Sequence, residues 1–501
     1  MGYNEIRLKV ILLCSLGFCV YLFVILSAGT VPISDFRGYF ERAMEILQGS
    51  PLSNQYKYFS AGGYPYLLAG VFRFFGTNSI LLPQILNALS LTLLLWLYLK
   101  SPLANFSFGV LVGYFIMIFN VNYLGMVTVL CTEIPYALFF LTGLLSFRWG
   151  LKEMFGSRSE SPRGVFLLFV ISGLFLGVSQ FIRAVTFTYV VIFSLVMVVG
   201  HHHFVLEGGR RGWKPVLLTS LRTLGLTWLT FFTVALLLYR ISGYGLTYMP
   251  LQKGLWNLFI GFNIETKGSW DSRDIELIDK LGHEHDWDAG RMNRDFKPIV
   301  LNRIKKSWIK NLQILPDKLY KLLNPRDIYF WSTAESNVVD KGKISKTAGY
   351  LSWLNGLVLL FCFGTWGLWL SKGKFLTEEF FAFCAMGAVF VYLLLHAYFL
   401  EVQARYSSHM WMVLFWCFPR CLQVLWRPFY ARASLVKGKR RVMGPIMIGV
   451  GIIVLFVSLF ADFLGIGGFP GFGKKQAAGA GIGIGIVVAG LILNRKPHRV
   501  C

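Results

Sequence analysis

Apolar runs of about 20 residues recur along this chain, and they constrain its fold more than any other feature. A helix of about 20 residues crosses the hydrocarbon core of a bilayer. The 501 residues are 55% hydrophobic and only 15% charged, whereas soluble domains are about 25% charged. We identify twelve such runs, which predict an all-α polytopic membrane protein with about 12 transmembrane helices. The runs are Leu8–Ala28, Ile80–Leu99, Phe106–Tyr123, Cys131–Trp149, Gly164–Ile182, Ala184–Gly200, Val216–Tyr239, Ala348–Leu370, Phe380–Leu400, Ser408–Trp426, Met443–Leu464 and Ala477–Leu493.

The first run could be mistaken for a secretory signal peptide. Its apolar core, Leu8–Ala28, is longer than that of a signal peptide, and no clear small-residue cleavage site follows it. We therefore expect this run to remain in the protein as a membrane helix.

The net charge of +24 would suit a nucleic-acid partner, but the distribution of the charge favours membrane topology. If the N-terminus is cytoplasmic and the loops alternate, most basic residues of the short loops fall on the cytoplasmic side, as in Arg427–Arg441. This bias is the positive-inside rule. It predicts a multi-pass cell-membrane protein with both termini in the cytoplasm and Asp35 outside, and it predicts no nucleic-acid partner.

The eight cysteines carry no sign of a disulfide framework or a metal site. Most of them lie within apolar runs, and none forms a CxxC pair. Neither disulfides nor a zinc site is therefore expected.

The hydrophilic segments divide the chain into four parts. Residues 1–239 are predicted to form an N-terminal transmembrane module whose first outer loop is 29–76, and residues 240–347 a long extracytoplasmic helical loop. Residues 348–426 supply the remaining transmembrane helices of the core. Residues 427–501 comprise a basic cytoplasmic loop and two accessory transmembrane helices. Long loops of this kind are often lids or binding elements.

The first outer loop is expected to contain two interfacial helices. Ser34 can cap a helix that begins near Asp35, and the apolar residues of that helix recur with a 3.6-residue period. They are Phe36, Tyr39, Phe40, Ala43, Met44 and Leu47. The segment Tyr64–Phe75 is too short to span a membrane easily and contains Arg73, so it is predicted to be a second interfacial or re-entrant helix.

Two further patterns concern the long loop and the last part of the chain. Ser272–Leu281 and Ala289–Leu315 are predicted to be helices. Gly479–Gly485 is a small-residue helix face that suits close packing in lipid. It is not a dinucleotide-binding loop, because no strand precedes it.

Ionisable residues at the predicted outer edge of the membrane are the candidates for chemistry. Asp35, Glu133 and Arg183 are the strongest. Each has a structural alternative. The two carboxylates could be placed at helix N-termini because the helix dipole favours negative charge there. The arginine side chain could extend to the membrane–water interface without binding a ligand. If the three residues act together, they should line one cavity at the outer face.

Four more residues complete the candidate set for substrate or phosphate binding. They are Tyr64, Lys267, Glu401 and Arg405. Glu401 and Arg405 have i,i+4 spacing, so the structural alternative for them is a helical ion pair.

Two groups of histidines are weaker candidates for a metal site. His201–His203 lie on the predicted cytoplasmic side and lack a defined ligand geometry. His283 and His285 belong to an acidic cluster in the long outer loop. Solvation of a loop is the favoured interpretation for both groups, and no metal site is assigned.

The residue types at the outer face favour one chemistry. A carboxylate could act as a general base on an acceptor hydroxyl. Arginine binds a phosphate through bidentate hydrogen bonds, and lysine binds it as a point charge. A leaving group attached to a lipid would explain why these residues lie at the membrane edge. Glycosyl transfer from a polyprenyl-phosphate sugar meets all three conditions. Cationic side chains can stabilise the leaving phosphate without a metal, although a divalent cation stays an alternative.

Several segments together resemble the integral-membrane glycosyltransferases of the GT-C class. The closest resemblance is to glycosyltransferase family 39, which includes protein O-mannosyltransferases and the lipid A aminoarabinose transferase. The resemblance runs from about Met1 to Trp426 and depends on order, spacing and common sidedness. The matching segments are SDFRGYFERA (Ser34–Ala43), YPYLLAG (Tyr64–Gly70), TEIPYALFF (Thr132–Phe140), QFIRAVT (Gln180–Thr186), NLFIGFNIETKGSW (Asn257–Trp270) and EVQARYSSHM (Glu401–Met410).

The resemblance implies a GT-C-like bundle and roles for individual residues. Asp35 would be the catalytic base or the group that orients the acceptor, and Glu133 would be a second catalytic carboxylate. Arg183 would bind phosphate. Lys267 and Arg405 are the weaker counterparts of family residues.

The chain departs from the family pattern at two places in the first outer loop. Phe36 follows Asp35 where many relatives have a second acidic residue, and Tyr64 replaces the first residue of a double proline. No MIR-type domain is found, so the resemblance favours a bacterial envelope enzyme over a eukaryotic protein O-mannosyltransferase.

The implied partners are a polyprenyl-phosphate sugar donor, a glycan, lipid or protein acceptor of the envelope, and membrane lipids. The alternative function is a transporter or flippase of lipid-linked sugars. Transporters tend to have internal repeats and polar residues at mid-membrane. The sequence has no clear repeat, and its candidate charges lie at one face.

Overall fold

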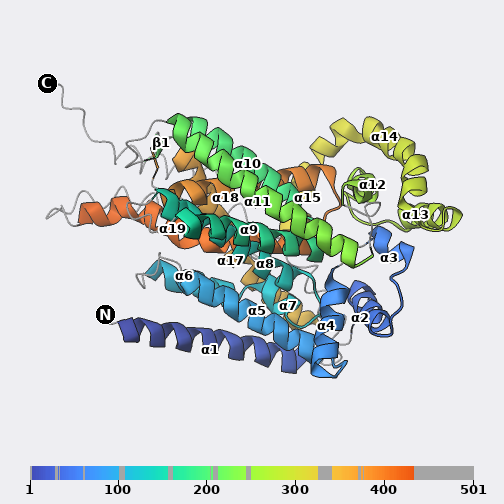
Figure 1. The fold of residues 1–501 in the computed structure, drawn as a ribbon, viewed down its shortest axis with the longest axis horizontal. Helices are drawn as coiled ribbons and strands as arrows, with labels where there is room; N and C mark the ends of the chain where they lie inside the picture. Colours follow the sequence, from blue (N-terminus) through green and yellow to red (C-terminus); the bar gives the residue numbers. More distant parts are fainter. Residues whose placement is uncertain are drawn as a thin grey trace.

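The described part of the chain is a bundle of long helices with shorter helices gathered at one end (Figure 1). The computed structural model describes residues 3–28, 32, 34–59, 63–100, 108–155, 162–203, 205–206, 213–243, 250–324, 341–370, 374–375 and 377–433. The predicted spans Met443–Leu464 and Ala477–Leu493, and the segment Gly479–Gly485, lie outside these residues. We refer to the end of the bundle that carries the helices of residues 34–75 and 250–323 as the loop end.

Within the described residues, six helices are long and apolar enough to cross a membrane. These are α1 (Tyr3–Ala28), α5 (Leu81–Lys100), α8 (Glu133–Phe155), α9 (Pro162–Ile182), α11 (Trp213–Ile241) and α18 (Thr377–Phe399). Shorter apolar stretches, Thr186–Val199 and Asn355–Leu370, belong to α10 (Thr186–His203) and α17 (Lys341–Leu370). The all-helical membrane architecture is confirmed, whereas the count of twelve spans is not.

The predicted span Phe106–Tyr123 is not one helix. It is divided into α6 (Phe108–Ile118) and α7 (Val121–Met126). The break lies at Asn120, whose side chain accepts a hydrogen bond from the backbone N–H of Asn122 (3.0 Å) and so caps α7. An apolar run does not reveal such a cap, because the flanking residues keep the run hydrophobic.

The only strands in the described residues are two residues long. β1 (Val205–Leu206) and β2 (Lys374–Phe375) pair in parallel, and β1 lies at the end of the bundle opposite the loop end (Figure 1). The tract His201–His203 forms the last residues of α10, directly before β1.

The bundle is held by close helix packing. Helix α9 lies between α8 and α11, and its glycines allow the approach. A Cβ atom on Gly173 would lie 2.5 Å from the Thr227 backbone oxygen, and one on Gly177 would lie 2.8 Å from the Val234 Cβ. Small residues at this spacing are typical of helix contacts in membranes.

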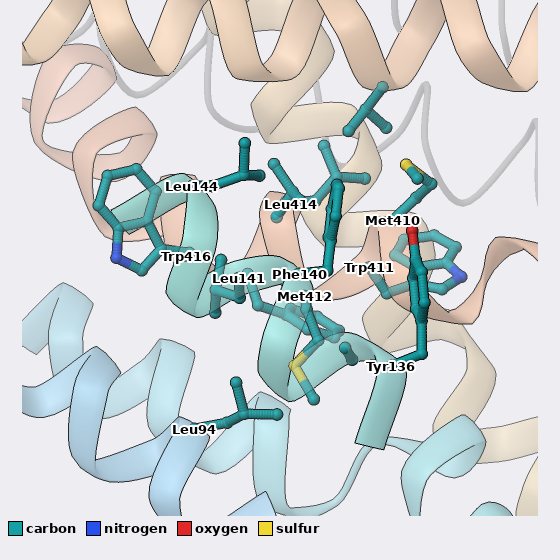
Figure 2. Packing of buried hydrophobic residues seen from close by; sticks show 14 of the residues in the cluster. Leu94, Tyr136, Phe140, Leu141, Leu144, Met410, Trp411, Met412, Leu414 and Trp416 are labelled. Carbon is teal, nitrogen blue, oxygen red and sulfur yellow. The ribbon is translucent and has the colours of Figure 1, made fainter. Parts of the chain in front are cut away.

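A large apolar cluster joins α8 to the last described helix, α19 (Ser408–Ala433). Figure 2 shows Tyr136, Phe140 and Leu144 of α8 packed among Met410, Trp411, Leu414 and Trp416 of α19, with Leu94 of α5 beside them. This packing fixes the first turns of α8 and α19 relative to each other, and both turns lie at the loop end.

The first outer loop forms three helices, α2 (Ser34–Leu47), α3 (Asn54–Phe59) and α4 (Tyr64–Phe75). The apolar stripe predicted for α2 is confirmed, because Phe36 and Ala43 are buried and the other four members are half-buried in the main core. Helix α2 packs on α4, with the rings of Phe40 and Phe72 5.8 Å apart.

The long loop forms α12 (Pro250–Gly261), α13 (Ser272–Glu284), α14 (Ala289–Gln313) and α15 (Leu315–Leu323). The two predicted helices correspond to α13 and α14, which begin after the N-caps Asp271 and Asp288. Helices α12, α13 and α14 have an apolar core of their own, which includes Trp256, Ile278, Phe296 and Tyr58 of α3, whereas α15 packs on the main core. The four-part division of the chain stays a prediction.

A buried lysine ties the long loop to the bundle. Lys318 of α15 donates to the backbone oxygens of Gly261 (2.7 Å) and Tyr398 (3.3 Å), and to the Asn311 side chain (3.3 Å). Gly261 ends α12 and Tyr398 lies in the last turn of α18. Asn311 lies in α14, so one side chain of α15 is bonded to three other helices, α12, α14 and α18.

Candidate active site

Two ion pairs lie close together at the loop end, and they are formed by four of the seven predicted site residues. The residues come from four distant segments: the start of α2, the start of α8, the α9–α10 turn and the short 3-10 helix η2 (Ala404–Ser407). Asp35, Glu133, Arg183 and Arg405 all act electrostatically on the same phenol, that of Tyr39.

The pair formed by Glu133 and Arg183 is buried. Glu133 is the first residue of α8, and its side chain is 4% exposed. Arg183 follows the last residue of α9 and donates from Nη1 to a Glu133 carboxylate oxygen and to the Thr132 hydroxyl (3.1 Å). Burial is the largest single influence and opposes the charge of Arg183, but the charge and hydrogen bond of Glu133, together with Tyr406, raise the pKa of the guanidinium.

The pair formed by Asp35 and Arg405 is more open to solvent. Arg405 Nη2 donates to Asp35 Oδ2 at 2.6 Å, and the Asp35 side chain is 48% exposed. The Nε atom of Arg405 is buried and has no hydrogen-bond partner among the described residues. The interpretation of Glu401 and Arg405 as a helical ion pair is wrong, because residues 401–403 are not helical and Arg405 pairs with Asp35 instead.

Tyr406 brings the two pairs together. The guanidinium carbons of Arg183 and Arg405 lie 5.0 Å and 5.4 Å from the centre of its ring. A cation at this distance from an aromatic ring is attracted by the ring quadrupole. The tyrosine therefore holds two positive groups near each other, where their repulsion would otherwise separate them.

Glu401 supports Tyr406 from within the protein. The Tyr406 hydroxyl donates to Glu401 Oε2 (3.2 Å), and the Gln403 amide donates to Oε1. Burial raises the pKa of Glu401 to about 7, against the lowering effect of Arg405 and of these hydrogen bonds. Glu401 is therefore placed to position Tyr406 rather than to contact a substrate.

Tyr64 contacts Tyr39, the tyrosine that lies near both ion pairs. It is the first residue of α4, it is buried, and its ring lies 5.3 Å from that of Tyr39 in an edge-to-face arrangement. Burial raises the pKa of Tyr39 and of Tyr64, and the Asp35 carboxylate raises that of Tyr39 further. Both phenols therefore stay protonated and can donate hydrogen bonds.

Lys267 is not part of the cluster formed by the two ion pairs around Tyr406. Its ammonium group pairs with Asp317 of α15 at 2.6 Å, and both side chains are about half exposed. Its neighbour Gly268 accepts a hydrogen bond from the Val402 backbone N–H (2.9 Å). The turn that carries Lys267 is therefore hydrogen-bonded to the segment before Arg405, although the Lys267 side chain pairs with Asp317.

The described residues contain no group of three or more His, Cys, Asp or Glu side chains arranged to hold a metal ion. At the cluster, each carboxylate is already paired with an arginine, so these residues do not fit a cation site. In the long loop, His285 pairs with Asp295 (2.9 Å) and the His283 ring lies 6.0 Å from that of Trp287.

Sequence reasoning missed Tyr406 and two buried histidines behind the cluster. His396 Nε2 donates to the Glu401 backbone oxygen (2.9 Å), and the His409 ring lies 4.9 Å from that of Tyr136. Tyr406 follows Arg405 directly in the segment EVQARYSSHM, so an aromatic next to a candidate arginine was a usable signal. The histidines gave none, because they lie in apolar runs.

The comparisons with known proteins give two structural similarities and no sequence family. No family model matches the chain, and no curated protein does. The oligosaccharyltransferase AglB from Archaeoglobus fulgidus, solved with an inhibitory peptide and a dolichol-phosphate, is similar at 11% identity and a TM-score of 0.47, covering 96% of this chain and 56% of that one. The oligosaccharyltransferase of this archaeon in the apo form gives 13% identity and a TM-score of 0.49, covering 97% and 55%.

The chain thus spans about half the length of those oligosaccharyltransferase chains. Similarities this low in both sequence identity and TM-score carry no argument about family or activity.

Proposed function

We propose that this protein is a membrane glycosyltransferase that moves a sugar from a polyprenyl-phosphate donor to an acceptor hydroxyl at the loop end. The observation that carries the proposal is the pairing of two arginines with two carboxylates around Tyr406. The sequence resemblance to glycosyltransferase family 39 and to the GT-C class supports the same reading.

The two arginines suit the phosphate of the donor. Both hydrogen bonds of Arg183 within the described residues come from Nη1, and Nε of Arg405 has no partner. Each guanidinium therefore has donors that no described residue occupies, and both side chains remain partly exposed, at 12% for Arg183 and 16% for Arg405. Arginine forks bind phosphate with two parallel hydrogen bonds, and preorganised charges of this kind stabilise a developing phosphate anion.

The reaction requires a base next to that phosphate. In the proposed step, the acceptor oxygen forms a bond to the anomeric carbon while the bond from that carbon to the phosphate oxygen breaks. The acceptor proton passes to Asp35, and polyprenyl phosphate leaves on the arginines. Asp35 is the more exposed of the two carboxylates, so it is the one that an acceptor can reach.

The ion pair also suggests an order of binding. A donor phosphate that engages Arg405 competes with Asp35 for the same guanidinium. Donor binding would thereby release the Asp35 carboxylate from Arg405, so that it can accept a hydrogen bond from the acceptor hydroxyl.

The proposal is tested with the purified full-length protein in lipid vesicles. Polyprenyl-phosphate sugars of different sugar types are supplied together with envelope glycan, lipid and peptide acceptors, and products are identified by mass spectrometry. We expect a glycosylated acceptor and free polyprenyl phosphate in equal amounts. Movement of intact donor across the bilayer with no cleavage would contradict the proposal and would favour the flippase alternative.

A further inference from the structure

The second half of α14 carries an exposed apolar face. Leu301, Trp308, Ile309 and Leu312 are all exposed, with Ile309 at 71% and Leu312 at 60%. Their spacing places them on one side of the helix. We call these four residues the α14 face. Exposed apolar groups gathered in this way mark a contact with another surface.

The α14 face continues a surface that already belongs to a membrane helix. The Trp308 ring lies 5.2 Å from that of Tyr398 and 6.1 Å from that of Phe399. The Tyr398 hydroxyl donates to the Trp308 backbone oxygen (3.1 Å). Phe399 ends α18, a candidate membrane-crossing helix. The α14 face therefore lies at the level where that helix leaves the hydrocarbon.

Figure 1 shows the course of the helix that makes this contact. Helix α14 begins at α13, at the far edge of the loop end, and returns toward the bundle beside α15. Pro298 lies inside the helix, before the α14 face. Only the second half of α14 is thus near the membrane end of α18.

The residues around the face are basic. From Lys297 to Gln313 the chain contains no acidic residue. Lys305, Lys306 and Lys310 are exposed, whereas Arg303 is taken by a bidentate pair with Asp274 (2.7 and 3.0 Å). Tryptophan and aliphatic residues with adjacent lysines are the composition of helices that lie in a bilayer interface.

We propose that the second half of α14 lies in the lipid interface at the loop end, with its apolar face among the acyl chains and its lysines on anionic headgroups. Helix α15 follows directly, and its Leu322 backbone oxygen accepts a hydrogen bond from Ser407 (2.7 Å), two residues after Arg405. The interface contact therefore anchors the long loop next to the candidate site. This inference does not depend on the proposed reaction.

The test measures the depth of single spin labels in reconstituted full-length protein. Cys19, the exposed cysteine among the described residues, and Cys501 are first replaced by serine. One label is placed with Ile309→Cys, and the control with Lys280→Cys on the exposed surface of α13. Collision with oxygen reports lipid contact, and collision with a water-soluble nickel chelate reports water contact. Vesicles contain phosphatidylcholine with or without phosphatidylglycerol.

We expect the label at 309 to collide with oxygen more than with nickel, and the label at 280 to do the reverse. Added phosphatidylglycerol should move label 309 deeper, and combined Lys305→Gln, Lys306→Gln and Lys310→Gln changes should remove this effect. A nickel-accessible label at 309 in both lipids would overturn the proposal. So would a label shielded from both reagents, which would indicate a protein partner, or a depth that does not respond to phosphatidylglycerol.

Discussion

At the residue scale, the candidate site consists of charges that balance one another before any substrate binds. Glu133 is buried with Arg183, and the half-exposed Asp35 is held by Arg405. A buried ion pair is costly to break by removing one partner, because the other charge is left without compensation. Removing both partners of a pair leaves no unpaired charge. Comparing single and double variants therefore separates the effect of a mutation on stability from its effect on catalysis.

The buried pair gives the first prediction. Arg183→Gln should lower the free energy of unfolding by about 3 kcal/mol, because the Glu133 charge is left unpaired. The double variant Glu133→Gln, Arg183→Gln should recover most of that loss without recovering transfer activity. Thermal unfolding midpoints in detergent and transfer rates check the two parts. A single variant as stable as the wild type would show that the pair is not structural.

Glu401 predicts a dependence of stability on pH. Its pKa is raised by burial from 4.5 to about 7, so the folded protein favours the neutral carboxyl. Glu401 makes its full contribution to the free energy of unfolding below about pH 4.5. This contribution, up to about 3 kcal/mol, is lost as the pH rises through 7. Glu401→Gln should flatten the unfolding midpoint between about pH 5 and pH 8, and an unchanged slope would exclude Glu401 as its source.

At the scale of elements, the turns and short helices at the loop end place the site. The amphipathic period of α2 was readable from the sequence, because its apolar stripe packs against one side of the bundle. The break between α6 and α7 was not, since a capping asparagine inside an apolar run leaves the run unchanged. The pairing of Arg405 with Asp35 was also hidden, because the two residues are 370 positions apart.

Gly261 gives a prediction for the docking of the long loop. A Cβ atom at this position would lie 2.4 Å from the Phe399 backbone oxygen and 2.6 Å from the Leu400 carbonyl carbon. Gly261→Ala should therefore separate α12 from the end of α18 and lower the unfolding midpoint by several degrees. Gly70→Ala is the matched control, because a Cβ there meets nothing within 4 Å. Equal midpoints for the two variants would contradict this docking.

At the scale of the whole molecule, the sequence supported the membrane class, the helical architecture and the clustering of Asp35, Glu133 and Arg183. Length and hydropathy suffice for the first two, because apolar runs of about 20 residues cross a bilayer as helices. The clustering of the three residues was predicted because all three charged segments were assigned to the same side of the membrane. The role of Tyr406 and the pairing of Lys267 with Asp317 depend on tertiary packing. The local sequence offered no signal for Lys267, and for Tyr406 it offered only the position next to Arg405.

The orientation of the bundle is a separate prediction. The loop end should face outward, and the far end of α8 should face the cytoplasm. In intact cells, a membrane-impermeant thiol reagent should label Lys280→Cys in α13 but should label Lys152→Cys in α8 only after permeabilisation. The reverse pattern would place the candidate site inside the cell and would exclude an extracytoplasmic acceptor.

The central claim is that Asp35 accepts the proton of the acceptor while the arginines hold the donor phosphate. The most direct measurement is single-turnover release of polyprenyl phosphate by Asp35→Asn, with Glu41→Gln on the exposed side of the same helix as the control. General bases contribute about 10²–10⁴-fold to rates. We predict a loss of release of that order for Asp35→Asn and a fully active control. Donor affinity of Asp35→Asn should be no weaker than that of the wild type, because the uncharged amide competes less for Arg405. Full release by Asp35→Asn would contradict the account.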